Sequence, residues 1–249
     1  HIETWTLNLP DARNPISDPA IVDALCGQVA VVNADHDVRA VVLTGAGSAF
    51  SAGGNVKDMV DRAGMFGGSP YQLRDGYRHG IQRIPRALYH CEVPVVAAVN
   101  GPAVGAGVQM AMLADLRVLD PSATIAIPAA KLGVTIDKWT LRRLEDLVGG
   151  GHARGVLMAA QKIGAEKLLD LGFANAIGDR EAALEFARGV AGLAPLSLQN
   201  YKALFKSDVA VEPLTEAEEA RLHAVWDSED LKEAIMARIE KRDPRFQGR

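Results

Sequence analysis

Hydrophobic residues along the first half of the chain recur with the two periods that regular structure produces. The opening residues alternate apolar and polar positions, which predicts a half-buried strand with Trp5, Leu7 and Leu9 on its buried face. Asp18 precedes apolar residues at helical spacing, which predicts a helix with this aspartate as its N-cap. Short apolar runs, which predict buried strands, alternate with further helices. The predicted strands are 2–9, 40–44, 93–99 and 116–119, and the helices are 18–33, 74–90 and 104–114.

Short apolar strands separated by helices are typical of a parallel α/β core. Beyond residue 139 the pattern becomes almost entirely helical, with Pro213 as a break near the C-terminus. We therefore expect a core over residues 1–190 and a helical segment over 191–249. Helices are predicted at 139–147, 153–160, 165–171, 181–193 and 197–240. One side of the last helices is too apolar to remain exposed; its residues are Leu222, Val225, Trp226, Ile235 and Ile239.

The composition argues against several classes of protein. Hydrophobic residues form 48% of the 249 residues, enough for a substantial core, so disorder is not expected. The 27 basic and 31 acidic residues give a net charge of −4, so we expect no bulk binding to nucleic acid or anionic membrane. Cys26 and Cys91 have no metal-ligand spacing, so no metal site or disulfide framework is predicted, and a reducing cytoplasm fits better.

An uncharged stretch over residues 93–114 is long enough to cross a membrane. Pro94, Asn100 and Gly101 lie inside it, together with further glycines and Gln109. Turn and polar residues in the middle favour a buried strand, a turn and a buried helix over a single helix in lipid. We therefore expect no membrane span.

Two glycine-rich loops, each directly after a predicted strand, are the main candidates for chemistry. The first glycine loop, residues 44–59, reads TGAGSAFSAGGNVKDM, and the second glycine loop, residues 100–115, reads NGPAVGAGVQMAMLAD. Glycine permits tight turns and lets backbone N–H groups approach a ligand. Neither loop has the dinucleotide-binding or P-loop pattern, and Ser51 lacks the flanking glycine of a nucleophile elbow. Taken alone, the loops fit either a binding site or ordinary tight turns.

Together, the two loops resemble the signatures of the crotonase (enoyl-CoA hydratase/isomerase) superfamily. The first resembles A-F-x-A-G-x-D-x-K and reads AFSAGGNVK over residues 49–57, and the second resembles N-G-x-A-x-G-G-G-x-E-L-A-x-x-x-D. The resemblance continues through Pro128 to residues 240–248 and so covers nearly the whole chain. It implies a spiral of ββα repeats with a helical C-terminal trimerisation segment, and therefore a homotrimer or a dimer of trimers.

The resemblance also implies a coenzyme A thioester as ligand or substrate, with no separate cofactor. By position, the backbone N–H groups of Gly54 and Ala106 would form an oxyanion hole. Amides at a turn and at a helix N-terminus can stabilise a negatively charged oxygen. Lys241 and Phe246 would reach the coenzyme A of a neighbouring subunit. Lys57 matches a coenzyme A contact by position, although most lysines are simply exposed on the surface. The residues matched to substrate or coenzyme A binding are Ala52, Lys57, Gly105, Lys241 and Phe246.

Both catalytic glutamates of the superfamily's hydratases are replaced in this sequence. Those glutamates position a water molecule and transfer its proton; the first matches Gln109 and the second matches Ala129. Glutamine can hydrogen-bond a water but cannot exchange a proton at neutral pH, and alanine can do neither. The sequence therefore predicts a protein that binds fatty acyl-CoA and has little or no hydratase activity.

Asp137 is the one acidic residue in the segment 129–139, which begins at the position of the second glutamate. Some relatives place an aspartate here as a proton carrier or nucleophile, so the alternative is an active isomerase or hydratase of fatty-acid metabolism with Asp137 as its acid/base. The plain structural interpretation is that Asp137 caps a helix that begins near residue 138. The two roles are compatible.

A fatty-acyl tail would need an apolar lining near the first glycine loop. Apolar residues at this place suit such a tail, although methionine and phenylalanine at this spacing are also typical of an ordinary core. The residues are Met59, Val60, Met65 and Phe66.

Overall fold

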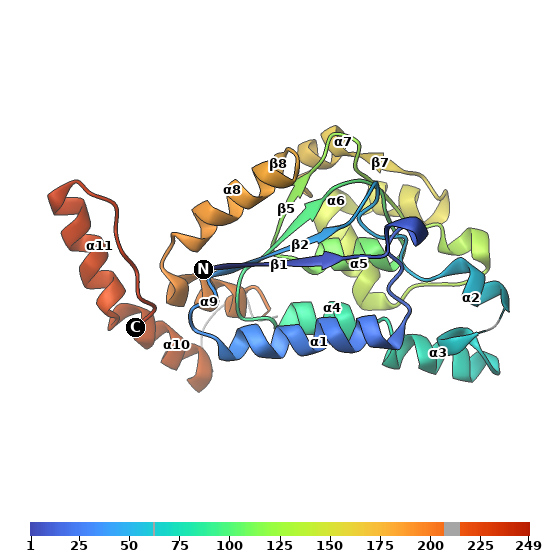
Figure 1. The fold of residues 1–249 in the computed structure, drawn as a ribbon, viewed down its shortest axis with the longest axis horizontal. Helices are drawn as coiled ribbons and strands as arrows, with labels where there is room; N and C mark the ends of the chain where they lie inside the picture. Colours follow the sequence, from blue (N-terminus) through green and yellow to red (C-terminus); the bar gives the residue numbers. More distant parts are fainter. Residues whose placement is uncertain (62, 207–214) are drawn as a thin grey trace.

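A parallel sheet lies at the centre of the computed structural model, which describes residues 1–61, 63–206 and 215–249. Within these residues the sheet has five strands in the order β1-β2-β3-β5-β8, and each pair of neighbours is parallel (Figure 1). The strands are β1 (Ile2–Leu7), β2 (Ala40–Gly45), β3 (Val95–Val99), β5 (Leu116–Leu119) and β8 (Ala176–Ile177). The predicted parallel α/β core is therefore confirmed.

Helices cover both faces of this sheet (Figure 1). Helix α8 (Arg180–Ala191) packs on one face through Ala183 and Ala187, which contact Val42 and Val96. The main hydrophobic core lies on the other face, beneath α1 (Pro19–Ala34), α4 (Arg83–His90) and α5 (Ala106–Leu113). The remaining helices are α2 (Val56–Asp61), α3 (Pro70–His79), α6 (Lys138–Met158), α7 (Ala165–Asp170), α9 (Pro195–Leu204), α10 (Glu216–Trp226) and α11 (Glu229–Glu240).

The first strand and helix follow the sequence pattern with one correction. Asp18 caps α1, since its Oδ1 accepts a hydrogen bond from the Ala20 N–H at 2.8 Å. Trp5 and Leu7 are buried, but Leu9 is exposed, so its predicted burial is wrong. The strand ends at Leu7, and a 3₁₀ turn (Pro10–Ala12) leads the chain away from the sheet.

Glycine changes two of the predicted helices. The helix predicted over 74–90 is two helices, α3 and α4, because the backbone at Gly80 is not helical (φ −103°, ψ −106°). A Cβ at Gly80 would lie 2.6 Å from the Gly76 carbonyl oxygen, so the bend needs this glycine. The helices predicted at 139–147 and 153–160 form one element, α6, which is kinked at Gly149 (φ 76°).

A second, smaller sheet holds the start of the second glycine loop in place. Strand β4 (Ala103–Val104) pairs in parallel with β6 (Thr124–Ala126), and β6 pairs antiparallel with β7 (Ile163–Gly164). The Gly105 N–H donates to the Ala126 carbonyl at 2.9 Å. These strands, like β8, are too short to give a periodic signal, and the sequence did not predict them.

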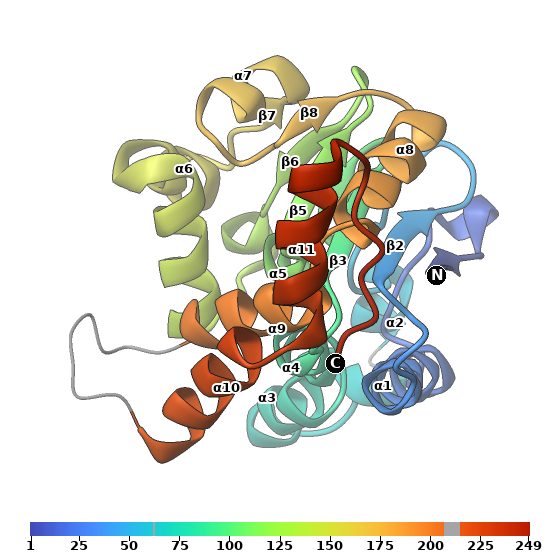
Figure 2. The same cartoon turned by 90° about the vertical axis from the view of Figure 1, so that its left-hand side faces the viewer.

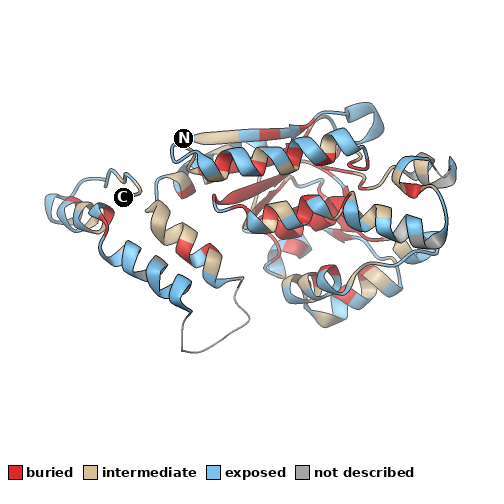
Figure 3. Ribbon diagram, turned by 90° about the horizontal axis from the view of Figure 1, so that it is seen from below, coloured by how far each residue is buried: buried red, intermediate tan, exposed pale blue. Residues whose placement is uncertain are grey.

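The last two helices, α10 and α11, project from the core (Figures 1 and 3). Viewed along the sheet, α11 and the C-terminal tail lie in front of the strands (Figure 2). Trp226, Ile235 and Ile239 are exposed, and Val225 is half-buried. Pro213 and the side chain of Leu222 lie outside the described residues. The boundary between residues 190 and 191 stays a prediction.

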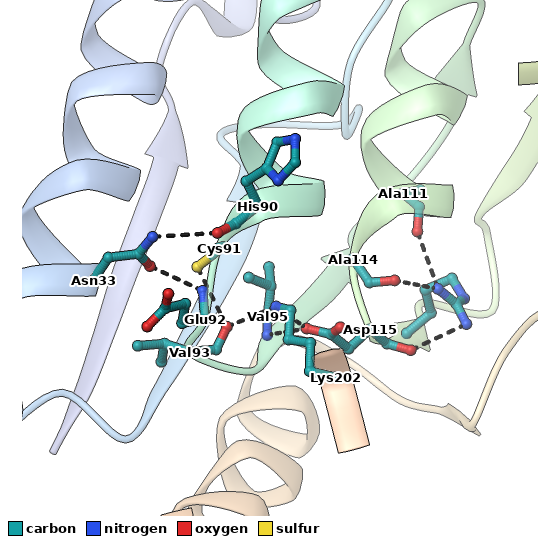
Figure 4. Close-up of polar contacts among 11 residues, drawn as sticks. Asn33, His90, Cys91, Glu92, Val93, Val95, Ala111, Ala114, Asp115 and Lys202 are labelled. Atoms are coloured by element: carbon teal, nitrogen blue, oxygen red, sulfur yellow. Dashed lines mark hydrogen bonds and ion pairs between the residues drawn. The ribbon is translucent and has the colours of Figure 1, made fainter. Parts of the chain in front are cut away.

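An ion pair between the buried Lys202 and the half-buried Asp115 attaches α9 to the sheet (Figure 4). The Lys202 side chain is 7% exposed, and its Nζ lies 2.5 Å from Oδ2 of Asp115 and 2.8 Å from the Val93 carbonyl oxygen. The same Asp115 oxygen accepts a hydrogen bond from the Val95 N–H at 2.7 Å. Both charges are therefore satisfied at the start of β3 and β5.

Candidate functional site

The two glycine loops pack directly against each other. Val104 N–H donates to the Ser51 carbonyl at 2.9 Å, beside a parallel bridge between Ser51 and Ala103. Gly53 has a φ of +78°, and a Cβ there would lie 2.5 Å from the Val104 oxygen and 2.8 Å from the Ala106 nitrogen. Glycine is required at this position by both the backbone conformation and the close approach. The first loop therefore lies against the N-terminus of α5.

Two backbone N–H groups at this junction have no hydrogen-bond acceptor among the described residues. Ala106 is the first residue of α5, where a helix leaves its N–H groups without an internal acceptor. Gly54 follows Gly53, whose Cα adjoins the Ala106 amide. In the described part of the chain, neither the Gly54 nor the Ala106 N–H donates a hydrogen bond. The positive end of the α5 dipole lies at the same point. This arrangement suits a partially negative oxygen.

A cavity of about 390 Å³ lies beside α5, between α4 and the start of α6. It brings together Gln109 and Asp137, which are separated in sequence. Ala129 does not line it; this residue is half-buried in a 3₁₀ turn (Ala129–Leu132) and packs against the main core. The lining residues are Gln82, Pro85, Arg86, Tyr89, His90, Gln109, Asp137, Trp139 and Thr140.

Gln109 occupies an almost completely buried polar position at this cavity. Gln109 is 1% exposed, like the rest of α5, in which every residue is buried. Its Nε2 donates to the Tyr77 hydroxyl over a long 3.4 Å, and its Oε1 has no partner among the described residues. Burial raises the pKa of Tyr77 to about 12, and the nearby Asp137 carboxylate contributes in the same direction. The phenol therefore keeps its proton at neutral pH.

Asp137 is the N-cap of α6, as one of its two sequence interpretations expected. Its Oδ1 accepts from the Thr140 N–H at 2.9 Å, and its Oδ2 accepts from the Thr140 hydroxyl at 2.6 Å. Gln82 Nε2 donates to the same Oδ2 at 2.8 Å. Both oxygens are thus fixed in position. An acid/base role for Asp137 stays a prediction.

Of the other predicted coenzyme A residues, Ala52 and Gly105 flank the junction of the two glycine loops, since they adjoin Gly53 and Ala106 in the chain. Lys57 is exposed on α2, and Ala52 donates its N–H to the Arg13 carbonyl at 2.8 Å. Lys241 and Phe246 lie on the C-terminal tail beyond α11, which projects from the core that holds the two glycine loops (Figure 1). Within one protomer they are not part of the site.

Met65 and Phe66, which lie after the first glycine loop, are not among the described residues that line the cavity. Phe66 is buried in the main core, and Met65 is half-buried against it. The side chains of Met59 and Val60 lie outside the described residues. Phe66 is therefore an ordinary core residue, the second of the two interpretations that its sequence position allowed.

Several residues of the site gave no usable signal in the sequence. Tyr77 reaches Gln109 from α3, and Gln82 reaches Asp137 from just before α4. Tyr89 and Trp139 close one side of the cavity with an edge-to-face contact of 5.3 Å between ring centroids. Thr140 alone was detectable, because it lies three residues after the predicted cap.

Neither a metal cluster nor a membrane helix is found in the described part of the chain. No three histidine, cysteine or acidic side chains there are grouped to hold an ion. None of the helices in the same residues is both long enough and apolar enough to cross a bilayer.

Known proteins with similar sequences and structures place the chain in a family. The model of the enoyl-CoA hydratase/isomerase family matches residues 1–249. A probable enoyl-CoA hydratase of Mycobacterium tuberculosis is 39% identical over 245 residues, which cover 98% of this chain and 95% of that protein.

Among solved structures, a putative enoyl-CoA hydratase from Streptomyces coelicolor is 31% identical with a TM-score of 0.86, over 99% of this chain and 90% of that one. The enoyl-CoA hydratase from Bacillus anthracis is 25% identical with a TM-score of 0.87, over 99% and 95% of the two chains. Sequence and fold agree over the whole length. The chain therefore belongs to the enoyl-CoA hydratase/isomerase family and has the crotonase fold.

Proposed function

We propose that this protein binds fatty acyl-CoA thioesters and catalyses little or no hydration of enoyl-CoA. The observation that carries the proposal is the pairing of intact glycine loops with lost carboxylates. Gly53 lies against the N-terminus of α5, while Gln109 and Ala129 match, by the sequence resemblance, the positions of the two hydratase glutamates. An amide and a phenol with a pKa of about 12 do not exchange protons efficiently at neutral pH.

In this proposal the thioester oxygen accepts hydrogen bonds from the Gly54 and Ala106 N–H groups. The free state of both donors and the α5 dipole support this role. Gln109 follows Ala106 by three residues, so the two lie on the same side of α5, about 4.5 Å apart along its axis. The first carbons of the acyl chain would then pass Gln109 and enter the cavity between α4 and α6.

The coenzyme A moiety would extend from the loops toward solvent. Ala52, Lys57 and Gly105 are proposed to contact it within the protomer, and Lys241 and Phe246 to contact the ligand of a neighbouring subunit. The position of those two beyond α11, a helix that projects from the core, supports an assembled state, a homotrimer or a dimer of trimers.

Palmitoyl-CoA, kept below its micelle concentration, is expected to bind at micromolar concentration and to raise the melting temperature. Gly54→Pro removes one N–H donor and should weaken binding about tenfold. Gly54→Ala is the matched control, because it retains the N–H. Isothermal titration calorimetry on the three proteins measures both effects. Palmitate that binds as tightly as its coenzyme A ester would show that the loops do not form a thioester site.

The alternative function is an isomerase or hydratase that uses Asp137. The observation in its favour is that Asp137 shares the cavity with Gln109. Any turnover of 2-enoyl-CoA or 3-enoyl-CoA by the native protein should then be lost in Asp137→Asn, because an amide does not exchange a proton. Turnover is followed by the absorbance of the conjugated enoyl thioester.

Asparagine also caps helices well, so the melting temperature should change little and serves as the control for folding. Activity that survives in Asp137→Asn would remove Asp137 from the chemistry. A native protein without turnover would leave Asp137 as a helix cap.

A further inference from the structure

Residues 13–17 lie alongside the middle of the first glycine loop. The Ala52 N–H donates to the Arg13 carbonyl at 2.8 Å. Three residues further along the loop, the Asn55 N–H donates to the Ser17 Oγ at 3.1 Å. These two bonds attach the loop to the segment on either side of its double glycine. Residues 13–17 therefore support the backbone of the loop at the point where the loop meets α5.

The peptide between Gly53 and Gly54 carries one of the two proposed donors. Glycine on both sides gives this peptide wide conformational freedom, so the loop by itself does not fix its direction. The Ile16 N–H donates to the Gly53 carbonyl at 2.8 Å, beside a parallel bridge between Pro15 and Gly53. In a planar trans peptide the C=O and N–H groups point in opposite directions. The bond from Ile16 therefore directs the Gly54 N–H away from this segment.

Asn14 holds residues 13–17 in the conformation that this contact needs. It is 1% exposed and has a φ of 55°, in the left-handed region that asparagine adopts more readily than most residues. Its Nδ2 donates to the Ala46 and Ala49 carbonyls at 2.8 and 2.9 Å. Its own carbonyl accepts from the Ser51 Oγ at 2.7 Å. Asn14 thus joins the segment to the glycine loop through both its side chain and its backbone.

The hydrogen bonds select asparagine among the residues that tolerate this backbone. Glycine takes a positive φ without strain but has no side chain to bond the loop. Aspartate also tolerates a positive φ, but its ionised carboxylate only accepts hydrogen bonds and would face the Ala46 and Ala49 carbonyl oxygens. Asn14 therefore combines the backbone conformation of a turn with two donors for the loop.

We infer that residues 13–17 direct the Gly54 N–H toward the thioester oxygen, and that Asn14 is the positioning residue on which this direction depends. The inference rests on the proposed function, in which that oxygen accepts from the Gly54 and Ala106 N–H groups. The Ala106 N–H is oriented by α5 and does not need Asn14. Loss of the Asn14 side chain should therefore weaken one of the two bonds to the ligand's carbonyl and no contact with the rest of the ligand.

The test compares palmitoyl-CoA with S-hexadecyl-CoA, a thioether that has a methylene group in place of the carbonyl, by isothermal titration calorimetry. The ratio of the two dissociation constants isolates the contribution of the carbonyl, because the rest of the two ligands is the same. The native protein should bind the thioester at least about tenfold more tightly. Asn14→Gly, which keeps the backbone conformation, should lower this ratio at least about threefold without changing the affinity for the thioether. Asn14→Asp should have the same effect, and it is the second variant should the glycine variant not fold.

Asn33→Gly is the matched control, because Asn33 also joins two backbone groups, the His90 carbonyl and the Glu92 N–H, at the opposite end of β3 from the second glycine loop. Its ratio should equal that of the native protein. A ratio that stays at the native value in both Asn14 variants would overturn the inference, even where the affinity for both ligands falls. The proposed function would then stand if Gly54→Pro still lowers the ratio. A native protein that binds both ligands equally, or neither, would overturn the proposed function and the inference with it.

Discussion

Gln109→Glu combined with Ala129→Glu is expected to raise the rate of crotonyl-CoA hydration by at least about 10²-fold over the native protein. The double variant restores both carboxylates of the family's hydratases, and a positioned acid–base group contributes typically about 10²–10⁴-fold. The glycine loops that would bind the thioester are already packed together. The measurement is kcat/KM from the loss of enoyl thioester absorbance.

Each single variant should gain far less, because the two carboxylates act as a unit and their effects are not additive. Gln109→Glu alone also places a carboxylate in a position that is 1% exposed, where desolvation raises its pKa. Gln28→Glu, on α1, controls for the added charge. A native protein that already hydrates crotonyl-CoA as fast as the double variant would contradict the proposed loss of catalysis.

The protein in solution should have the mass of three or six chains, and Trp226→Glu or Ile239→Glu should reduce it to a monomer of 26.5 kDa. Both side chains are 68% exposed in the protomer, on the two helices that project from the core. A buried charge in an apolar interface costs several kcal/mol, which is enough to separate subunits at micromolar concentration. Multi-angle light scattering measures the mass directly.

Val31→Glu is the control, because Val31 is similarly exposed, at 54%, but lies on α1 against the side of the core. It should leave the mass unchanged. A native protein that runs as a monomer at micromolar concentration would contradict both the assembly and the proposed sharing of coenzyme A between subunits.

Local patterns in the sequence predicted most of the fold, because they are properties of single segments. Asp18 and Asp137 cap the helices that follow them, and β5 has the predicted bounds. Errors arose where glycine alters the backbone within a helical pattern, as at Gly80 and Gly149. Hydrophobic periodicity contains no information on such a bend, since the residues on both sides of it face the same core.

The candidate site was predicted less completely, because its contacts join separate elements. The glycine loops were recognisable as motifs, and both N–H donors follow from them. Gln82 and Asp137, however, are 55 residues apart, and Tyr77 and Gln109 are 32 apart. No pattern within either segment specifies its partner. The family resemblance predicted that Gln109 replaces a carboxylate, while its unpaired oxygen became visible only in three dimensions.

Lys202 contacts residues that lie far before it in the sequence, and this separation affects the order in which contacts can form during synthesis. Lys202 binds Val93 and Asp115, which precede it by 109 and 87 residues. A ribosome releases both partners, and every strand of the central sheet through β8, before it releases Lys202. Segments made first generally fold first. The contact that anchors α9, and with it the exposed helices beyond, is therefore among the last long-range contacts available to the nascent chain.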